Sequence, residues 1–446
     1  MNRHSVLFLS LLAVTSPASA QTREPLCATV ETRRLASAPF LLAEGSDYVA
    51  ARPFASVAPD GAAFVVAVRD PDQTLRIGER RTLPRALAEL EYQGPAAPSA
   101  RTPGLAVLRV SRELRVVGDA VHLTDPVPST RGAETFPPGI PVAVTVDAGV
   151  LVLQHIDGDV YATLVPTTGA PTAPARVAQA PAVFRGHRGF VWISAAPRVN
   201  GDVHGAAALA GTDQGEVVAL SFDGQGARAG DPVLWQQRVG GAMQLVAVNG
   251  RRDPVALLER PVRGTTLEGA QARAQVLVHL SATLEPQGEP VALGLGPYET
   301  TAVARGDRLV LSQWAEARGF AVSALPVTAE GVGVETPRIW TTERFEGVPL
   351  GHRATLGPGG VIYDLMLHGD DVAGGLHAYA TFVPPAGSPF SRRDVMPLRA
   401  RVIARPALLP AEDGFVAVMG VYDELGGGID AVHVRCEMVT LPPATR

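Results

Sequence analysis

Lysine is absent from the 446 residues of this chain, so arginine and histidine are its only basic side chains. A phosphate-binding loop of the GxxxxGK type and Schiff-base catalysis both need a lysine, and the sequence excludes both. The sequence also lacks an HExxH zinc motif and a GxSxG nucleophile elbow. No recognisable catalytic motif is left, which favours a binding protein over an enzyme.

Charge is sparse as well: charged residues make up 19% of the chain, and the formal net charge is −5. No basic stripe marks a surface for nucleic acid, and no polybasic segment would attract anionic lipid. Hydrophobic residues make up 46% of the chain, which is ample for a folded core. We therefore expect a folded monomer with no nucleic-acid partner, no cofactor and no metal.

The first 20 residues have the pattern of a signal peptide. Arg3 supplies the positive charge, a short apolar run follows, and Ala18-Ser19-Ala20 fits the small-x-small cleavage rule. The apolar run is too short for an ordinary transmembrane helix, and no second long apolar run follows. We expect residues 1–20 to be removed and residues 21–446 to form one exported domain, periplasmic or extracellular, without a membrane span.

Cysteine occurs only twice, at Cys27 and Cys436, near the two ends of the chain. An exported protein meets an oxidising compartment, where disulfides persist, and two cysteines allow only one pairing. The alternative is two separate buried thiols. The disulfide is favoured, and it predicts that the two ends of the chain lie side by side.

Long amphipathic helical patterns are nearly absent, and short apolar, β-branched runs separated by Gly, Pro and Asp predict strands instead. A hairpin of a strand, a turn and a strongly apolar strand recurs along the chain. Its seven copies are residues 56–68, 144–154, 184–194, 246–259, 302–314, 354–367 and 408–421. A second hairpin with a weaker, more polar outer strand follows several copies, at residues 105–123, 217–235, 276–293 and 321–340.

Two such hairpins make four antiparallel strands, A to D, and in this the chain resembles the β-propeller superfamily over its mature length. The resemblance concerns architecture and no particular family, since a Trp-Asp repeat ending is missing. Residues 221–226 approach a sialidase-type Asp-box once, with a displaced glycine. The resemblance implies an all-β, seven-bladed propeller whose last blade is completed by an N-terminal strand at about 26–36. A solenoid or two tandem sandwiches are the alternatives, but neither explains cysteines at both ends.

The expected B–C loops, which emerge on the same face as the D–A loops, are rich in acidic residues and histidines. The carboxylates selected as candidate binding residues are Asp70, Asp72, Asp157, Asp159, Asp202, Asp370, Asp371 and Asp423. Such carboxylates near a ring axis would suit a hard cation, a basic ligand or a sugar. The alternative is that Asp and Gly are common in turns because they tolerate turn geometry. Calcium-type spacing is absent, so no metal ligands are predicted.

The first B–C connection contains an insertion at about 71–102, and its middle, residues 82–93, is the best helical stretch of the chain. Such an insertion could be a lid or a docking element, or a tolerated surface loop.

Two functions of different class stay open. The first is a non-catalytic scaffold that binds a protein or carbohydrate ligand on the B–C face. The second is a hydrolase or lyase that uses paired loop carboxylates such as Asp370 and Asp423. The expected A–B turns look more basic, with Arg188 and Arg251, and offer an alternative face for an acidic partner.

Overall fold

The computed structural model describes most of the strands of the chain. The described residues are 23–37, 54–57, 63–69, 104–123, 141–156, 158–179, 190–200, 202–212, 215–235, 241–248, 254–267, 270–295, 299–315, 319–328, 331–332, 338–339, 348–369, 376–385, 390–393, 396, 401–402, 406–423 and 426–440. Within them the only helical segment is a single 3₁₀ turn, Pro358–Gly360. The predicted helix at 82–93 and the insertion around it lie outside the described residues.

The described strands form seven antiparallel sheets, and six of these consist of strands that follow one another in the sequence. The strands of the first three are β2 (Phe54–Val57), β3 (Ala63–Arg69), β4 (Gly104–Val110) and β5 (Val121–Leu123); β6 (Val142–Val146), β7 (Gly149–Ile156), β8 (Asp159–Pro166) and β9 (Ala175–Ala178); and β10 (Phe190–Asn200), β11 (Val203–Thr212), β12 (Val217–Phe222) and β13 (Val233–Leu234).

The next three sheets continue the same order. They contain β14 (Gly241–Val246), β15 (Val255–Leu267), β16 (Ala270–Leu280) and β17 (Pro286–Leu295); β18 (Glu299–Arg305), β19 (Arg308–Ala315), β20 (Gly319–Thr328), β21 (Gly331–Val332) and β22 (Arg338–Ile339); and β23 (Val348–Leu356), β24 (Ile362–Gly369), β25 (Leu376–Val383) and β26 (Phe390–Arg393).

The remaining sheet, called the terminal sheet below, combines strands from both ends of the chain. It contains β27 (Arg401–Val402), β28 (Ala407–Ala411), β29 (Gly414–Asp423), β30 (Gly426–Thr440) and β1 (Arg23–Ser37). The two short strands β27 and β28 pair with successive parts of β29, β30 follows, and β1 is outermost.

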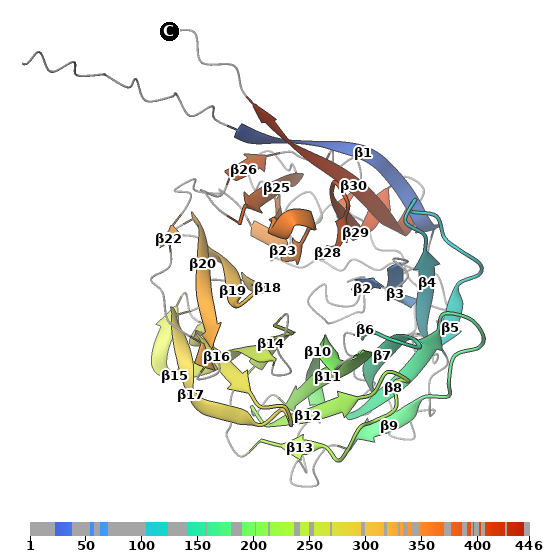
Figure 1. The fold of residues 1–446 in the computed structure, drawn as a ribbon, viewed down its shortest axis with the longest axis vertical. Coiled ribbons are helices and arrows are strands. Elements are labelled where there is room, and N and C mark those ends of the chain that lie inside the picture. Colours follow the sequence, from blue (N-terminus) through green and yellow to red (C-terminus); the bar gives the residue numbers. More distant parts are fainter. Residues whose placement is uncertain are drawn as a thin grey trace, which may run out of the picture.

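The sheets are arranged around a common centre, with β2, β6, β10, β14, β18, β23 and β28 innermost (Figure 1). These inner strands contact one another in a circle, β2 to β6, β10, β14, β18, β23, β28 and back to β2. The chain is therefore an all-β propeller of antiparallel, mostly four-stranded sheets.

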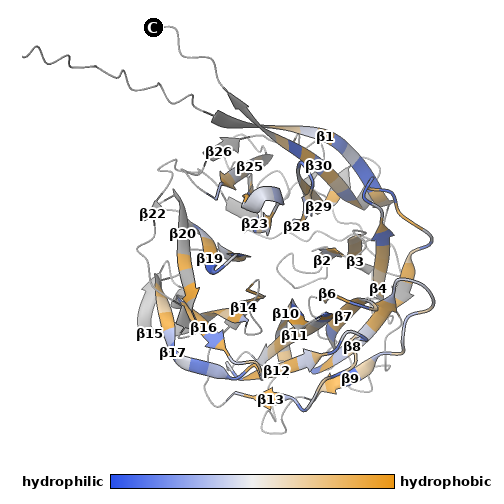
Figure 2. Cartoon of the chain, in the orientation of Figure 1, coloured by the Kyte–Doolittle hydropathy of each residue, from blue (hydrophilic) through white to orange (hydrophobic). Residues whose placement is uncertain are grey.

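The core lies between the sheets, because each sheet buries both of its faces. Alternate residues of β29 show this: Phe415 and Ala417 pack toward the β23–β26 sheet, while Val416 and Val418 pack toward the β2–β5 sheet. Figure 2 shows the resulting apolar bands along strands on all sides of the ring. Each neighbouring pair of sheets shares one such buried cluster. Two-sided burial explains why the inner strands of the sequence are continuous apolar runs.

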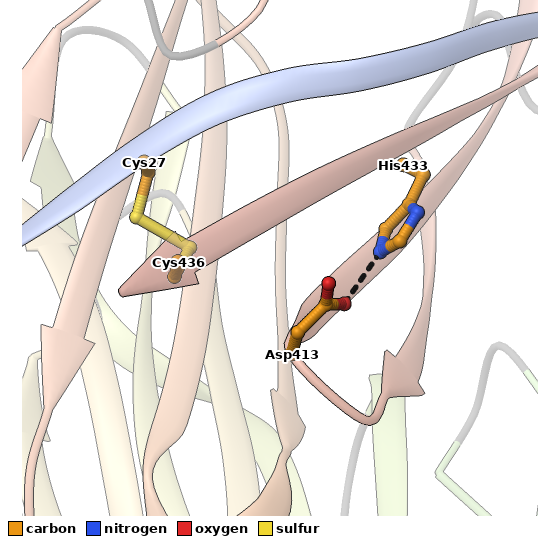
Figure 3. The surroundings of a disulfide bond; sticks show 4 residues. All are labelled: Cys27, Asp413, His433 and Cys436. Atoms are coloured by element: carbon orange, nitrogen blue, oxygen red, sulfur yellow. Dashed lines mark hydrogen bonds and ion pairs between the residues drawn. A yellow bond between two sulfur atoms is a disulfide. The ribbon is translucent and has the colours of Figure 1, made fainter. Parts of the chain in front are cut away.

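Strands β1 and β30 pair antiparallel along almost their full length, and Cys27 lies directly opposite Cys436. The two cysteines form a disulfide with a Cα–Cα distance of 4.2 Å (Figure 3). The predicted disulfide is thus confirmed. The predicted N-terminal strand also lies in the sheet of the C-terminal strands, as its outermost member.

One of the seven predicted A–B hairpins is wrong. Residues 184–194 were expected to contain a turn followed by strand B, but residues 190–194 begin β10, which is the inner strand A of its sheet. Strand B is β11, an alanine-rich segment. Alanine has low strand propensity, but at this position four alanines fit the tight space between sheets. The apolar stretch at 190–194 was therefore assigned to strand B, although it belongs to strand A.

A five-residue turn recurs at the C–D ends of three sheets, beginning at Ser111, Asp223 and Ser281. In each turn the first side chain accepts hydrogen bonds from the backbone N–H groups two and four residues later. The fourth residue has positive φ: Leu114 at 56°, Gly226 at 73° and Leu284 at 66°.

The two leucines at positive φ are buried, and this offsets their backbone strain. Leu284 packs into the cluster shared with the preceding sheet, and its carbonyl accepts the Trp235 Nε1–H at 2.9 Å. Leu114 packs in the same way against the terminal sheet. At Gly226, Leu151 and Leu164 of the preceding sheet lie against the position that a Cβ would take. The turn therefore anchors each of these sheets on the sheet before it.

Because Leu284 has a positive φ, a glycine at this position should be less destabilising than an alanine. Leu284→Ala should lower the free energy of unfolding by about 2–5 kcal/mol. Leu284→Gly should lower it by about 1 kcal/mol less, because glycine removes the strain of a positive φ. Urea unfolding of both variants measures the difference. Leu258 in strand β15 is the control, since there the glycine variant should be the less stable one. If the glycine variant were the less stable one at position 284 as well as at position 258, strain at Leu284 would be ruled out.

Removal of the disulfide should lower the stability of the folded protein. The double variant Cys27→Ser/Cys436→Ser should lose about 2–5 kcal/mol of unfolding free energy, because its unfolded chain is no longer cross-linked. Urea unfolding of the oxidised protein and of the variant gives this number. Superimposable unfolding curves would show that the cross-link does not stabilise the fold.

Candidate functional site

The two faces of the ring carry different connections: A–B and C–D turns lie on one face, B–C and D–A connections on the other. Of the predicted binding residues, Asp159 and Asp423 lie at B–C strand ends, as expected: Asp159 begins β8 and Asp423 ends β29. The others, except Asp202, lie outside the described residues: Asp70, Asp72, Asp157, Asp370 and Asp371. The structure therefore does not bring the acidic set together within its described part.

The placement of Asp202 on the B–C face was wrong. Asp202 lies in the tight turn between β10 and β11, which is the A–B turn of that sheet, and it is exposed on the opposite face. The error follows from the assignment of residues 190–194 as strand B. Arg188, which was expected in an A–B turn, lies outside the described residues.

Asp159 is already engaged by a cation of the protein itself. Its Oδ2 lies 3.3 Å from Nη1 of Arg176, which is on the outer strand β9 of the same sheet. The adjacent Gly158 carbonyl accepts the backbone N–H of Phe190 at 3.0 Å and so joins this turn to the next sheet. Among the residues that the structure describes, no group of three His, Cys, Asp or Glu side chains could hold a metal ion.

The sequence analysis did not identify one buried cluster of polar side chains in the described part of the chain. Ser312 of β19, His352 of β23 and Asp364 of β24 form a hydrogen-bonded cluster between two sheets, and all three are almost fully inaccessible to solvent. His352 Nε2 lies 2.7 Å from Asp364 Oδ2 and 2.9 Å from Oδ1. The Ser312 hydroxyl donates to Asp364 and lies 3.3 Å from the same His352 nitrogen.

These residue types are those of a hydrolytic triad, but their geometry is not. In such a triad the histidine uses one ring nitrogen for the serine and the other for the carboxylate. Here Ser312 and Asp364 both approach Nε2, and the serine donates directly to the carboxylate. A cluster with no accessible nucleophile cannot reach a substrate. The cluster links two sheets and satisfies a buried carboxylate.

Similar polar links join other inner strands. Gln244 of β14 makes two 2.9 Å hydrogen bonds to the backbone of Ala302 in β18. The Ser194 hydroxyl of β10 accepts the backbone N–H of Leu245 at 2.8 Å. Each link makes the register of one sheet against the next specific, which apolar packing alone does less well.

On the face that carries the A–B turns, arginine side chains of one sheet donate hydrogen bonds to the C–D turn of the next sheet. Arg305 Nη1 donates to the carbonyls of Val383 and Pro384 at 3.1 and 3.0 Å. Arg109 of β4, beside the C–D turn of its own sheet, donates from Nη1 to the Thr167 carbonyl of the next sheet at 2.9 Å. Arg198 donates to the Ala282 carbonyl.

The β6–β7 turn makes the corresponding contact through its backbone. The Asp147 N–H donates to the His204 carbonyl at 2.9 Å, and the Ala148 N–H donates to the Gly224 carbonyl at 2.9 Å. Several residues in and beside the described turns of this face thus make contacts between sheets.

Beside the disulfide, Asp413 accepts hydrogen bonds from two residues of β30 (Figure 3 shows the one from His433). His433 Nε2 lies 2.8 Å from Oδ1, and Arg435 Nε lies 2.6 Å from Oδ2. The Asp413 carbonyl also accepts the Cys436 backbone N–H at 2.7 Å. Partial burial alone would raise the pKa of Asp413, but the hydrogen bonds from Arg435 and His433 outweigh it and hold the pKa below its usual value.

The described part of the chain contains no helix long and apolar enough to cross a membrane.

Comparison with known proteins identifies no family: no family model matches the chain, and no curated protein sequence matches it. Solved structures do match. A protein of unknown function from Dyadobacter fermentans is 10% identical, with a TM-score of 0.48 over 92% of this chain and 99% of that chain. BBS1N in complex with ARL6DN is 9% identical, with a TM-score of 0.49 over 94% of this chain and 98% of that chain.

Trypanosoma rangeli sialidase in complex with the inhibitor DANA is 10% identical, with a TM-score of 0.42 over 73% of this chain and 57% of that chain. At these identities no residue role passes from the neighbours to this chain. The propeller assignment rests on the sheets and their order.

The buried cluster predicts a stability effect. Asp364→Ala leaves His352 and Ser312 buried without their shared acceptor and should lower the free energy of unfolding by about 3–5 kcal/mol. Asp202→Ala, an exposed turn variant, should change it by less than about 0.5 kcal/mol. Urea unfolding measures both. An Asp364→Ala protein as stable as the parent would contradict the role given to the cluster.

The Asp413 contacts predict a pH dependence with a definite sign. Because the folded-state pKa is depressed, the contribution of Asp413 is fully present above the unfolded value of about 3.9. It is lost as the pH falls through the folded-state pKa. The stability difference between the parent and Asp413→Asn should therefore be present at about pH 5 and shrink toward zero as the pH falls below the folded-state pKa. A difference that grew on acidification would contradict this sign.

Proposed function

We propose that this chain is an exported, non-catalytic β-propeller that binds a protein or carbohydrate ligand on the face carrying its B–C turns. The observation that carries the proposal is the use of the other face. Residues in or beside its turns bind neighbouring sheets. They are Asp147 in an A–B turn, Arg198 and Arg305 near the ends of first strands, and Arg109 in β4 beside a C–D turn. Polar groups engaged in this way are less free to bind a ligand, which favours the B–C and D–A connections as the binding surface.

The architecture proposed here is a seven-bladed ring closed by β1 in the terminal sheet. Seven sheets, one shared core cluster for each neighbouring pair, and the pairing of β1 with β30 support it. Such a ring presents its connections as one continuous surface, so that a ligand can contact several sheets at once.

Export is proposed from the signal-peptide pattern of residues 1–20 and is supported by the Cys27–Cys436 disulfide. Disulfides persist in oxidising compartments such as the periplasm or the extracellular space. Removal of residues 1–20 would leave Cys27 close to the mature N-terminus, where β1 brings it to Cys436.

The hydrolase alternative gains no support from the described residues. The one Ser-His-Asp set is buried and has the wrong nitrogen geometry. Of the carboxylate pair proposed for it, Asp423 ends a strand and Asp370 lies outside the described residues.

The test begins with a glycan array and a co-purification screen of the exported protein, which supply a ligand. Asp157→Ala combined with Asp370→Ala, on the proposed B–C face, should weaken its binding about tenfold or more, while the unfolding curve stays unchanged. The matched control is Asp202→Ala combined with Glu412→Ala, two exposed acidic residues of A–B turns. This control should bind as the parent does. Loss of binding in the control alone would place the ligand on the A–B face and refute the proposal.

A further inference from the structure

The N-terminal strand β1 is attached to the ring differently from every other strand in the described part of the chain. Its one strand neighbour is β30, from the opposite end of the sequence. Residues 38–53 connect it to β2, which belongs to a different sheet. The other strands of the terminal sheet are close to one another along the chain, so β1 is the member that can leave without breaking a local hairpin.

Side-chain burial contributes little to holding β1 in place. Among its residues 27–36, Leu35 alone is buried, and Ala28, Val30 and Thr32 are exposed. Leu35 lies at a register shift and packs into the cluster between the terminal sheet and the β2–β5 sheet. The strand is otherwise held by its backbone pairing with β30, by the Arg34–Asp430 ion pair and by the disulfide.

Each of these attachments is specific for β1 and independent of which copy of the chain supplies it. The edge of β30 offers the same backbone groups, the same Asp430 carboxylate and the same Cys436 thiol to the β1 strand of a second molecule. Exchange of a terminal element between identical chains preserves every native contact and costs little beyond the link between the chains.

We infer that the Cys27–Cys436 disulfide is a latch that fixes the oligomeric state. Formed within one chain, it locks β1 in its own ring and the protein is a monomer. With the latch open, β1 exchanges between two copies, and each ring is completed by the β1 strand of the other. The partner is thus a second copy of this chain, and the occupant of the β30 edge is its residues 23–37.

Closing the latch between chains is ordinary thiol–disulfide chemistry. The Cys27 thiolate of one chain attacks a mixed disulfide of Cys436 with glutathione on the other. The sulfur–sulfur bond between the chains forms, and reduced glutathione leaves. Oxidised glutathione accepts the two electrons that the pair of thiols gives up, so one molecule is reduced to two of reduced glutathione for each disulfide formed.

The test uses two single variants that cannot form the latch alone. Cys27→Ser keeps Cys436, and Cys436→Ser keeps Cys27. One of them is isotope-labelled, and the two are mixed and incubated with the reduced and oxidised glutathione couple. Strand exchange predicts a covalent heterodimer, in which mass spectrometry finds the Cys27 peptide of one chain joined to the Cys436 peptide of the other. Failure to form it, or a product made only of Cys27–Cys27 and Cys436–Cys436 dimers, would overturn the inference.

A proline control separates exchange from random oxidation. The 4.2 Å Cα–Cα distance is that of a non-hydrogen-bonded pair, and the Cys436 N–H indeed points to Asp413. The next pair, Ala28 with Arg435, is therefore hydrogen-bonded. Ala28→Pro removes its donor. Placed in the Cys436→Ser chain, it should reduce the heterodimer yield at least fivefold, whereas Thr29→Pro, whose N–H faces away from β30, should reduce it much less. Equal yields would show random oxidation and refute the exchange.

The parent protein gives an independent measurement if a variant fails to fold. Reduced, unfolded chains refolded with the glutathione couple should give a dimer fraction, containing Cys27–Cys436 links between chains, that rises with protein concentration. A dimer fraction of zero at all concentrations would refute the inference.

Discussion

Ring closure is the constraint on which this structure depends. Every sheet is apolar on both faces, so each must be covered on both sides by another sheet. A row of such sheets would leave one open face at each end. The terminal sheet covers both open faces. Leu365 of the β23–β26 sheet packs in one cluster with Phe415, and Val65 of the β2–β5 sheet packs in another with Val418. The outer strand of the terminal sheet comes from the N-terminus, which joins the two ends of the chain.

Polar side chains between the sheets fix how neighbouring sheets, already held by apolar packing, are placed against one another. The Ser312–His352–Asp364 cluster and the Gln244 contacts lie between sheets, where an unpaired donor or acceptor would cost stability. They make one relative placement of the sheets favourable. The arginines of the A–B face do the same at the surface. In this protein the side chains that could be mistaken for catalytic machinery serve assembly, which agrees with a binding role.

Much of the fold could be predicted from the sequence, because two-sided burial makes strong apolar strands and turns punctuate them. The disulfide was predictable because only Cys27 and Cys436 exist. The A–B hairpin at 184–194 could not be placed, since the alanines of β11 carry little strand signal. That single shift moved Asp202 to the wrong face. Ser312, His352 and Asp364 are scattered along the sequence, and only the packing of two sheets brings them together.

The central claim, that β1 is an integral strand of the closed ring, is tested most directly by peptide-resolved amide hydrogen exchange of the oxidised protein. If β1 completes the ring, the peptide covering residues 23–37 should keep about half of its amide hydrogens protected, because alternate amides of this strand face β30. Its protection should be lost together with that of β30 as denaturant is added. Exchange of residues 23–37 at the rate of an unfolded chain, while β29 and β30 stay protected, would contradict the closure of the ring by this strand.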